Sequence, residues 1–255
     1  MQTTIPKIQQ KSFDYWDFNN EIDLMICDIP FGISFTGKPS NYNRRSNLVV
    51  DGYVEWNRNE IPYYLELLFT SAEQYLKKTG SLLIFAGWQI SNLIAKKYLD
   101  IQNNLSLTHQ GKLYWNYNFS PHCTKRPNTN CYEIFWFTRS KNWFYNNRCS
   151  LDHCQNGEAN LSVLDNHISV LTIKKEYLKG IPKYPTRFPS LLVKIIIEHF
   201  SDKNSTILDP LCGSGIIGAI CDLYYPDRIV YLGDLNPHSP IVFTELLKFY
   251  SNGAD

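Results

Sequence analysis

Four consecutive residues near the N-terminus carry groups that can hold and activate an amine: Asp28, Ile29, Pro30 and Phe31. The Asp28 carboxylate and the Ile29 carbonyl can both accept hydrogen bonds from an NH2 group, and the Phe31 ring can stack on a planar substrate. Pro30 stiffens the backbone between them. The segment therefore fits a substrate that is a flat ring carrying an amino group. The plainer alternative is a turn in which Asp28 caps the backbone and Phe31 fills the core.

A glycine-rich turn lies in the last quarter of the chain, in Leu208-Asp209-Pro210-Leu211-Cys212-Gly213-Ser214-Gly215. A short apolar run precedes it and a helical pattern follows, so the glycines allow a tight turn and close approach of a ligand to the main chain. Asp234 follows Gly215 by about nineteen residues, where a nucleotide-binding unit places an acid for ribose hydroxyls. With Gly218 the turn also completes G-x-G-x-x-G. The pattern predicts an adenosine ligand, and it does not separate a dinucleotide from another adenosine cofactor.

The composition excludes several classes of protein. The chain has 255 residues, with 25 Lys and Arg against 24 Asp and Glu and a hydrophobic fraction of 44%. This is unlike a disordered chain or a strongly basic DNA binder, so any contact with nucleic acid must come from local patches. No apolar run reaches the roughly 18 residues of a membrane span. We therefore expect a cytoplasmic protein that does not bind membranes.

The cysteines and histidines of the middle third do not have the close C-x2-C spacing of a structural zinc site. The seven cysteines also do not suggest a secreted disulfide framework. We expect no metal here. The residues concerned are His122, Cys123, Cys131, Cys149, His153 and Cys154.

Strand and helix patterns alternate along the chain, which predicts an α/β fold with a mostly parallel sheet. Apolar runs predict strands at residues 23–27, 81–86, 105–116, 131–138, 206–208 and 229–233. Helical spacing of apolar residues predicts helices at residues 61–78, 89–99, 190–200, 215–224 and 240–250, with Gly80 as the stop after the first. Residues 32–59 form a long loop of a kind that is usually functional. Residues 142–180 have no regular pattern.

Taken together, these segments resemble the motifs of amino-methylating DNA methyltransferases. Asp28 to Phe31 resembles their D-P-P-Y/F motif, and Leu208 to Gly218 resembles their S-adenosylmethionine motif, D-P-F-x-G-S-G-T-T-G. Tyr184 to Pro189 resembles their H-P-T-x-K-P segment, and Asn130 to Lys141 resembles their strand N-x-x-E-x-x-x-x-x-x-x-K. The catalytic motif precedes the cofactor motif, as in the circularly permuted β group. The resemblance covers roughly residues 22–250.

The resemblance implies a doubly wound, Rossmann-like methyltransferase sheet with an antiparallel hairpin at one edge. It implies S-adenosyl-L-methionine as the cofactor and Asp28, Ile29, Pro30 and Phe31 as the catalytic segment. Because the motif begins with Asp, the expected target is the N6 amine of adenine in double-stranded DNA. The cofactor-binding residues that it implies are Asp28, Thr186, Asp209, Pro210, Leu211, Cys212, Gly213, Ser214, Gly215 and Asp234.

A base inside a duplex is out of reach of such a site, so we expect the target nucleotide to be flipped out of the stack. Two groups of basic residues are candidates for phosphate contacts: Lys38, Arg44 and Arg45 in the long loop, and Lys125 and Arg126 in a second loop. Residues 142–180 lie where the β group reads its target sequence. We expect a single methyltransferase domain over residues 1–255 with this small inserted recognition region. Its size suggests a short target site, a homodimer or an accessory subunit.

Five positions depart from the motifs of the family: Ile29, Tyr184, Phe188, Ile216 and Ile217. At position 29 only the backbone carbonyl is needed, so the acceptor is retained. The departures keep a catalytically degenerate methyltransferase-like subunit open as an alternative. Methylation of cytosine N4 or of RNA also stays open. A nucleotide-dependent oxidoreductase is a further alternative, although it leaves Asp28 to Phe31 unexplained.

Overall fold

The computed structural model describes residues 7–32, 55–117, 124–125, 127–147, 169–178, 184 and 187–252. Their strands form one eight-stranded sheet with the order β1-β8-β7-β2-β3-β5-β4-β6. The strands are β1 (Ile8–Gln9), β2 (Ile22–Asp28), β3 (Leu76–Ala86), β4 (Thr108–Asn116), β5 (Cys131–Thr138), β6 (Val170–Thr172), β7 (Thr206–Asp209) and β8 (Ile229–Gly233). All neighbouring pairs are parallel except β3 with β5 and β5 with β4. The predicted α/β fold with an antiparallel hairpin is confirmed, and the short β6 lies outside that hairpin.

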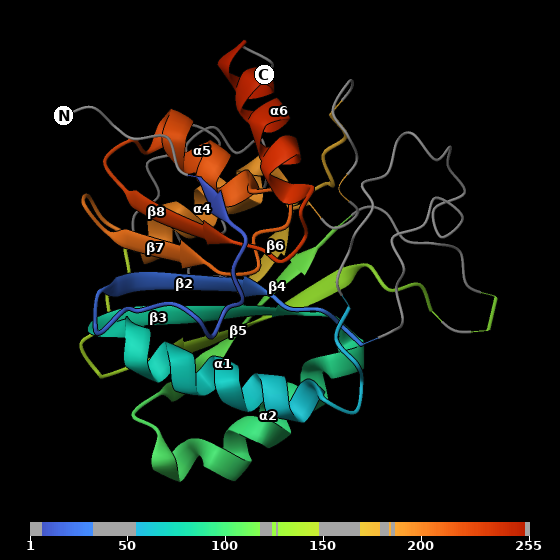
Figure 1. The fold of residues 1–255 in the computed structure, drawn as a ribbon. Helices are drawn as coiled ribbons and strands as arrows, with labels where there is room; N and C mark the ends of the chain where they lie inside the picture. Colours follow the sequence, from blue (N-terminus) through green and yellow to red (C-terminus); the bar gives the residue numbers. More distant parts are fainter. Residues whose placement is uncertain are drawn as a thin grey trace.

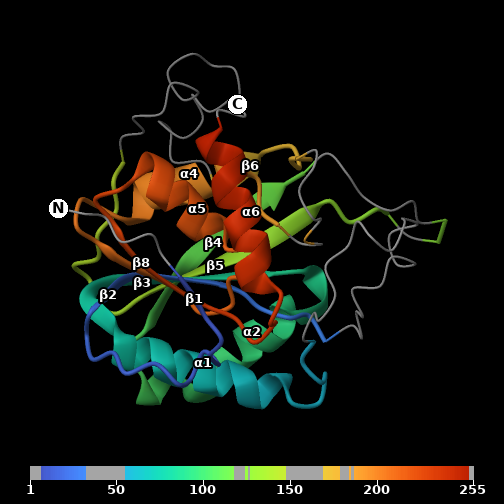
Figure 2. The ribbon, with the colours of Figure 1, turned by 45° about the horizontal axis from the view of Figure 1, so that its top comes forward.

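Helices cover both faces of this sheet, as Figure 1 shows. The helices α1 (Ile61–Tyr75) and α2 (Trp88–Ile101) lie on one face, and α4 (Ser190–Phe200), α5 (Ile216–Tyr224) and α6 (Ser239–Ser251) lie on the other (Figures 1 and 2). A 3-10 turn, η3 (Gln102–Asn104), follows α2. Among the described residues no helix has the length and apolar character needed to cross a membrane.

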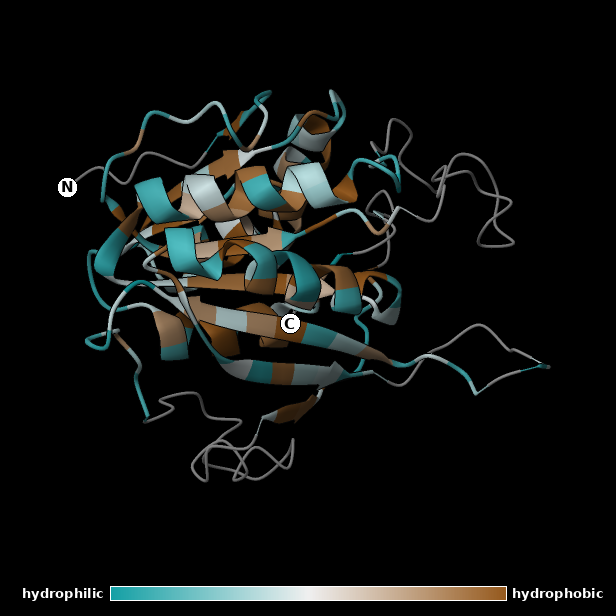
Figure 3. Ribbon diagram, turned by 90° about the horizontal axis from the view of Figure 1, so that it is seen from below, coloured by the Kyte–Doolittle hydropathy of each residue, from teal (hydrophilic) through white to brown (hydrophobic). Residues whose placement is uncertain are grey.

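The central strands are apolar on both sides because both of their faces are covered. In β2, Leu24 and Ile26 belong to the core under α4, α5 and α6, whereas Met25 and Cys27 belong to the core under α1 and α2. All four are at most 1% exposed. In Figure 3 the hydrophobic residues lie mainly along the inner strands, and the helices carry both colours. This two-sided burial explains why the strand signal was a continuous apolar run rather than an alternation.

The first helix is shorter than predicted. It ends at Tyr75, and the chain enters β3 at Leu76 without a loop. Leu76 is fully buried and pairs with Ile22 on β2, so burial favours the extended conformation over another helical turn. Gly80 therefore lies inside β3, and its predicted role as a helix stop was wrong.

Asp23 joins three strands at their amino ends. Its Oδ2 atom accepts a hydrogen bond from Lys77 Nζ of β3 at 2.7 Å and one from the backbone N–H of Thr206 of β7 at 2.8 Å. Each of these residues is the first or second of its strand. The contacts therefore fix the mutual register of β2, β3 and β7 at the edge of the sheet opposite their carboxyl ends.

Residues 142–180 are not wholly irregular. Within them β6 pairs in parallel with β4, and Trp115 Nε1 donates a hydrogen bond to the Ile173 carbonyl at 2.9 Å. A strand of three residues is too short to produce a sequence pattern, and it forms because Leu171 and Ile173 fill the core. Residues 148–168 and 179–180 of this region lie outside the described residues.

Candidate active site

The predicted catalytic segment begins at the carboxyl end of β2, between β7 and β3. Asp28 is the last residue of the strand and is partly buried. Ile29 is 1% exposed and packs into the core, whereas Asp28 and Pro30 on either side of it line the pocket described below. The backbone N–H of Gly32 donates a hydrogen bond to Glu55 Oε1 at 2.8 Å, which connects the end of the segment to the residues that precede α1.

Phe31 contributes to the core as well as to the turn. Its ring lies 5.6 Å from the ring of Tyr132 on β5, measured between centroids. It packs against both hydrophobic cores. The plainer alternative for this residue therefore holds in part, and stacking on a substrate ring stays a prediction.

The glycine turn connects β7 to α5 and requires left-handed backbone at two positions. Gly213 has a φ of 50° and Gly215 a φ of 73°, a region that side chains other than glycine rarely enter. A Cβ atom at Gly213 would lie 2.7 Å from Cε1 of Tyr184, and one at Gly215 would lie 2.6 Å from Cδ2 of Phe243. Both glycines are therefore needed for this turn, by conformation and by space.

Asp234, the acid after β8, is bonded to the glycine turn itself. Its Oδ2 atom accepts a hydrogen bond from the Gly213 N–H at 2.7 Å, and its Oδ1 atom accepts one from the Asn236 N–H at 2.7 Å. Each carboxylate oxygen retains a second lone pair for a ligand hydroxyl. Asp234 thus orders the turn in addition to the ligand contact predicted for it.

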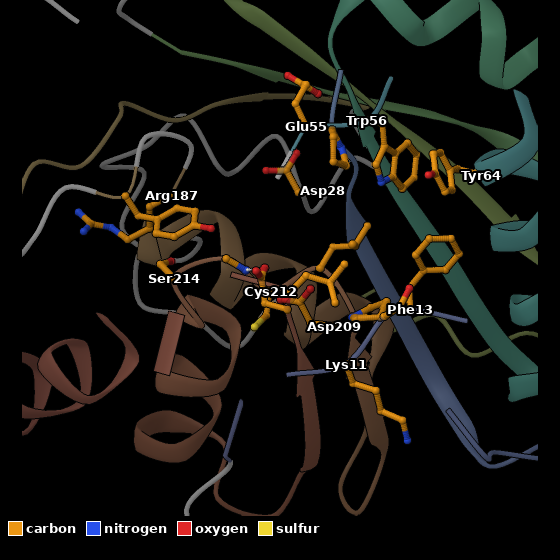
Figure 4. A pocket seen from close by; sticks show the side chains of 18 of the residues that line it. Lys11, Phe13, Asp28, Glu55, Trp56, Tyr64, Arg187, Asp209, Cys212 and Ser214 are labelled. Atoms are coloured by element: carbon orange, nitrogen blue, oxygen red, sulfur yellow. Dashed lines mark hydrogen bonds between the residues drawn. The ribbon is translucent and has the colours of Figure 1, made fainter. Parts of the chain in front are cut away.

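The two predicted motifs meet in one pocket of about 360 Å³. Figure 4 shows Asp28, Glu55 and Trp56 on one side of it and Asp209, Cys212 and Ser214 on the other. Of the predicted site residues, the lining includes Asp28, Pro30, Asp209, Pro210, Leu211, Cys212, Gly213, Ser214 and Asp234. The predicted residues Gly215, Ile29 and Phe31 do not line the pocket. Gly215 lies against Phe243, and Ile29 and Phe31 pack into the hydrophobic core after Asp28.

Sequence reasoning missed a group of lining residues from outside the motifs. They are Lys11, Ser12 and Phe13 after β1, and Glu55, Trp56, Asn57, Glu60 and Tyr64 around the start of α1. Three of them form a run of rings, with centroid distances of 5.8 Å between Phe13 and Trp56 and 4.9 Å between Trp56 and Tyr64. The strand that brings Phe13 here has only two residues, so its sequence carried no usable signal.

The pocket is rich in carboxylates that burial makes easier to protonate. Burial raises the pKa of Asp28 to about 7, and the nearby Lys175 ammonium opposes this rise. Burial also raises the pKa of Asp209 and of Asp234, and for Asp209 the Asp234 and Asp28 carboxylates add to the rise. A ligand that brings positive charge into this pocket would therefore stabilise the ionised forms.

The positions that depart from the motifs have structural roles. Phe188 is 6% exposed and packs on Phe85 of β3 with 4.3 Å between ring centroids. Ile216 and Ile217 are 3% and 2% exposed in the first turn of α5. The Tyr184 ring lies against the glycine turn. Each substitution adds packing around the pocket, and the acids and the glycines of the motifs remain.

Several predicted residues lie outside the described part of the chain: Lys38, Arg44, Arg45, Arg126 and Thr186. The same holds for His122, Cys123, Cys149, His153 and Cys154. Lys125 is described and is exposed to solvent. Among the residues that the structure describes, no group of three His, Cys, Asp or Glu side chains is placed to hold a metal ion.

Comparison with known proteins gives the family. The family model described as DNA methylase, of the N6 and N4 type, matches residues 22–225. The type II methyltransferase M.HinfI of Haemophilus influenzae is 30% identical over 213 residues, which are 79% of this chain and 56% of that protein. The chain spans about half the length of the curated relatives it matches, with 56% and 39% of the first two.

Solved structures share the fold at low sequence identity. The M1.HpyAVI–SAM complex has a TM-score of 0.60 at 16% identity, covering 89% of each chain. The cytosine-N4-specific PvuII DNA methyltransferase has a TM-score of 0.64 at 14% identity, covering 93% of this chain and 88% of the other. The family match covers well over half of the sequence and includes both motifs that form the pocket. The chain belongs to the N6/N4 DNA methylase family.

Proposed function

We propose that this protein is a DNA methyltransferase that moves a methyl group from S-adenosyl-L-methionine to the exocyclic N6 amine of a flipped adenine. The observation that carries the proposal is the meeting of Asp28 with the glycine turn and Asp234 in one pocket. These are the acceptor for an amine and the cradle for an adenosine cofactor, and they come from opposite ends of the sequence.

The residues of the pocket fit S-adenosyl-L-methionine. The left-handed turn lines the pocket at Gly213, and Asp234 retains lone pairs for ribose hydroxyls. Asp209 and Asp28 suit a cation, and Thr186 would complete the set by resemblance to the family. When bound, this cofactor supplies an electrophilic methyl group on a positively charged sulfur.

The same electrostatics disfavour the oxidoreductase alternative. A dinucleotide would bring a pyrophosphate with two negative charges to the turn between Gly213 and Gly215. There it would face Asp209 and Asp234, both of which resist ionisation already because of burial. These two carboxylates therefore favour a cationic adenosine ligand over an anionic one at the turn.

In the proposed mechanism, Asp28 and the Ile29 carbonyl accept hydrogen bonds from the two N–H groups of the target amine. This holds the nitrogen lone pair toward the methyl group, and positioning supplies much of the acceleration. The Asp28 carboxylate stabilises positive charge as it develops on nitrogen and then takes a proton. A pKa of about 7 suits that role near neutral pH, because the group can both accept and release a proton there.

The choice of adenine rests on Asp28 as the first residue of the motif. The fold does not decide it, since the PvuII enzyme of similar fold is cytosine-N4-specific. Mass spectrometry of nucleosides from DNA incubated with the protein and S-adenosyl-L-methionine tests the base directly. We expect N6-methyladenine. N4-methylcytosine would overturn the assignment of adenine while keeping the family chemistry. A methylated base in RNA alone would overturn the assignment of DNA as the substrate.

We further propose double-stranded DNA as the partner, with the recognition region within residues 142–180 of a single domain. The basic residues Lys38, Arg44, Arg45, Lys125 and Arg126 are proposed phosphate contacts. A homodimer or an accessory subunit would extend the small recognition surface. M.HinfI is named a type II methyltransferase, so a role in restriction–modification is part of this proposal.

A further inference from the structure

Lys175 lies near the catalytic turn although it is distant from it in sequence. It follows β6, and β6 is parallel to β4. Because β4 and β3 are both antiparallel to β5, the carboxyl ends of β2, β3, β4 and β6 are all at one edge of the sheet. Asp28 is the last residue of β2 at that edge. Lys175 follows the end of β6 at the same edge, three residues after Thr172.

A cluster of rings holds the Lys175 side chain at this edge. Its Nζ atom lies 4.5 Å from the centroid of the Tyr117 ring. Tyr117 packs on Trp115 at 5.2 Å and on Tyr132 at 5.6 Å, and Tyr132 in turn packs on Phe31 of the catalytic turn at 5.6 Å. These contacts form a continuous path of packed side chains from Lys175 to the turn that carries Asp28.

The backbone before Lys175 is fixed to the same hairpin. The Ile173 N–H donates to the Asn116 carbonyl at 3.0 Å, and the Ile173 carbonyl accepts the Trp115 Nε1 hydrogen bond. Ile173 is 4% exposed, so its side chain is also held in the core. The position of the Lys175 backbone is therefore set by the sheet.

Among the described residues, two neighbouring groups interact unfavourably with the ionised form of Asp28. Asp209 on β7 and the Cys27 thiol on β2 are coupled to it, and each is itself harder to ionise because of Asp28. The acidic Glu55 and Asp234 line the same pocket, and so do the cationic Lys11 and Arg187. Burial lowers the pKa of Lys175 and the Asp28 carboxylate raises it, which is the reciprocal of the effect of Lys175 on Asp28.

We propose that the Lys175 ammonium is the countercharge of the Asp28 carboxylate, held against the catalytic turn by β6 and the Trp115, Tyr117 and Tyr132 rings. Lys175 is then a positioning residue, which acts on the target amine through Asp28. The positioning role depends on the proposed function, whereas the charge pair itself does not depend on it. It also links the end of the proposed recognition region to the acceptor of the target base.

The pair can be tested in the protein alone by NMR of ¹³C-labelled aspartate carboxyl groups across a pH titration. The resonance lost in Asp28→Asn identifies Asp28. We expect a midpoint near pH 7 in the wild type. In Lys175→Met the midpoint should rise by about one pH unit, because the ammonium that opposes the rise of the Asp28 pKa is removed while the apolar stem is kept. Lys175→Arg should retain a midpoint close to that of the wild type.

Lys194→Met is the matched control. Lys194 Nζ lies 3.4 Å from the centroid of the Tyr224 ring, so this variant removes a cation from an aromatic ring elsewhere in the fold. Its Asp28 midpoint should equal that of the wild type. An unchanged Asp28 midpoint in Lys175→Met, with thermal melting that shows a folded protein, would overturn the proposal.

A pH profile of methyl transfer then separates this proposal from the proposed function. In Lys175→Met the rate should fall about tenfold near pH 6.5 and recover toward the wild-type rate near pH 9, as the higher Asp28 midpoint is passed. A loss that is equal at all pH values would overturn the positioning role. If the wild type transfers no methyl group while the NMR midpoint still moves, the charge pair stands and the proposed function fails.

Discussion

The two sides of the pocket are built in different ways. The proposed cofactor side comes from one short stretch, β7 to α5, in which the Gly213 N–H donates a hydrogen bond to the Asp234 carboxylate. The proposed amine side includes Asp28 and Glu55 before α1, and Lys175 after β6 acts on Asp28 although it does not line the pocket. The first side depends on backbone shape, and the second depends on charges brought together by the whole sheet. Substitutions on the two sides should therefore fail in different ways.

The largest difference between the two sides of the pocket is expected from Asp28→Ala. Removing the acceptor should lower methyl transfer by ~10²–10³-fold, because the stabilisation of the developing charge on nitrogen is lost. Binding of S-adenosyl-L-methionine, measured by calorimetry, should change less than about tenfold, since the glycine turn is intact. Equal losses in both measurements would show that the two sides are not separable.

Gly215→Val should produce the opposite pattern. A β-branched side chain at a φ of 73°, with its Cβ 2.6 Å from Phe243, cannot keep the turn. We expect cofactor affinity to fall by roughly 100-fold, with the melting temperature lowered as well. Gly111→Ala is the control, since it also strains the backbone at a positive φ, of 150°, but lies in β4 outside the pocket lining and has open space around its Cβ position. Cofactor affinity in Gly111→Ala should stay at the wild-type value.

Asp234→Asn tests how much the proposed cofactor side depends on the hydrogen bond between the Gly213 N–H and the acid. One carboxylate oxygen becomes an NH2 group that faces a backbone N–H of Gly213 or Asn236. We expect about a tenfold loss of cofactor affinity, because a hydrogen bond to a charged acceptor is worth roughly 1.5–3 kcal/mol. The exposed Asp100→Asn change should leave the affinity unaltered.

The smallest effect is expected on stability. The raised pKa of Asp28 means that the folded protein binds more protons than the unfolded chain between about pH 4 and pH 7. The contribution of this group to stability therefore falls as pH rises through that window. Asp28→Asn should raise the melting temperature of the ligand-free protein by roughly 2–4 °C at pH 8 and by less at pH 5. A larger rise at pH 5 would contradict the direction of the pKa shift.

The parts of the fold that sequence predicted best are those in which a long element is buried along one face. The helix at residues 190–200 and the strand at residues 131–138 have the predicted bounds. By contrast, β1 and β6 have two and three residues, and they form because neighbouring strands supply their hydrogen bonds. The end of α1 was missed for the same reason, since pairing of Leu76 with Ile22 outweighs the helical pattern.

The candidate site divides in the same way. Asp28, the glycine turn and Asp234 are local patterns, and they meet as expected. Phe13, Trp56 and Lys175 reach the site only through the topology of the sheet. Their positions depend on pairings between segments far apart in the chain, which no window of sequence contains.

The contacts of Asp23 have a mechanical consequence for the pocket. They hold β2, β3 and β7 together at the amino ends of the strands, on the far side of the sheet from Asp28 and Asp209. β2 and β3 are also paired as far as Asp28 and Phe85, so the end of the strand that carries Asp28 is held from both directions. Any adjustment to a ligand therefore falls on the segments that follow the strands, while the register of the three strands is preserved.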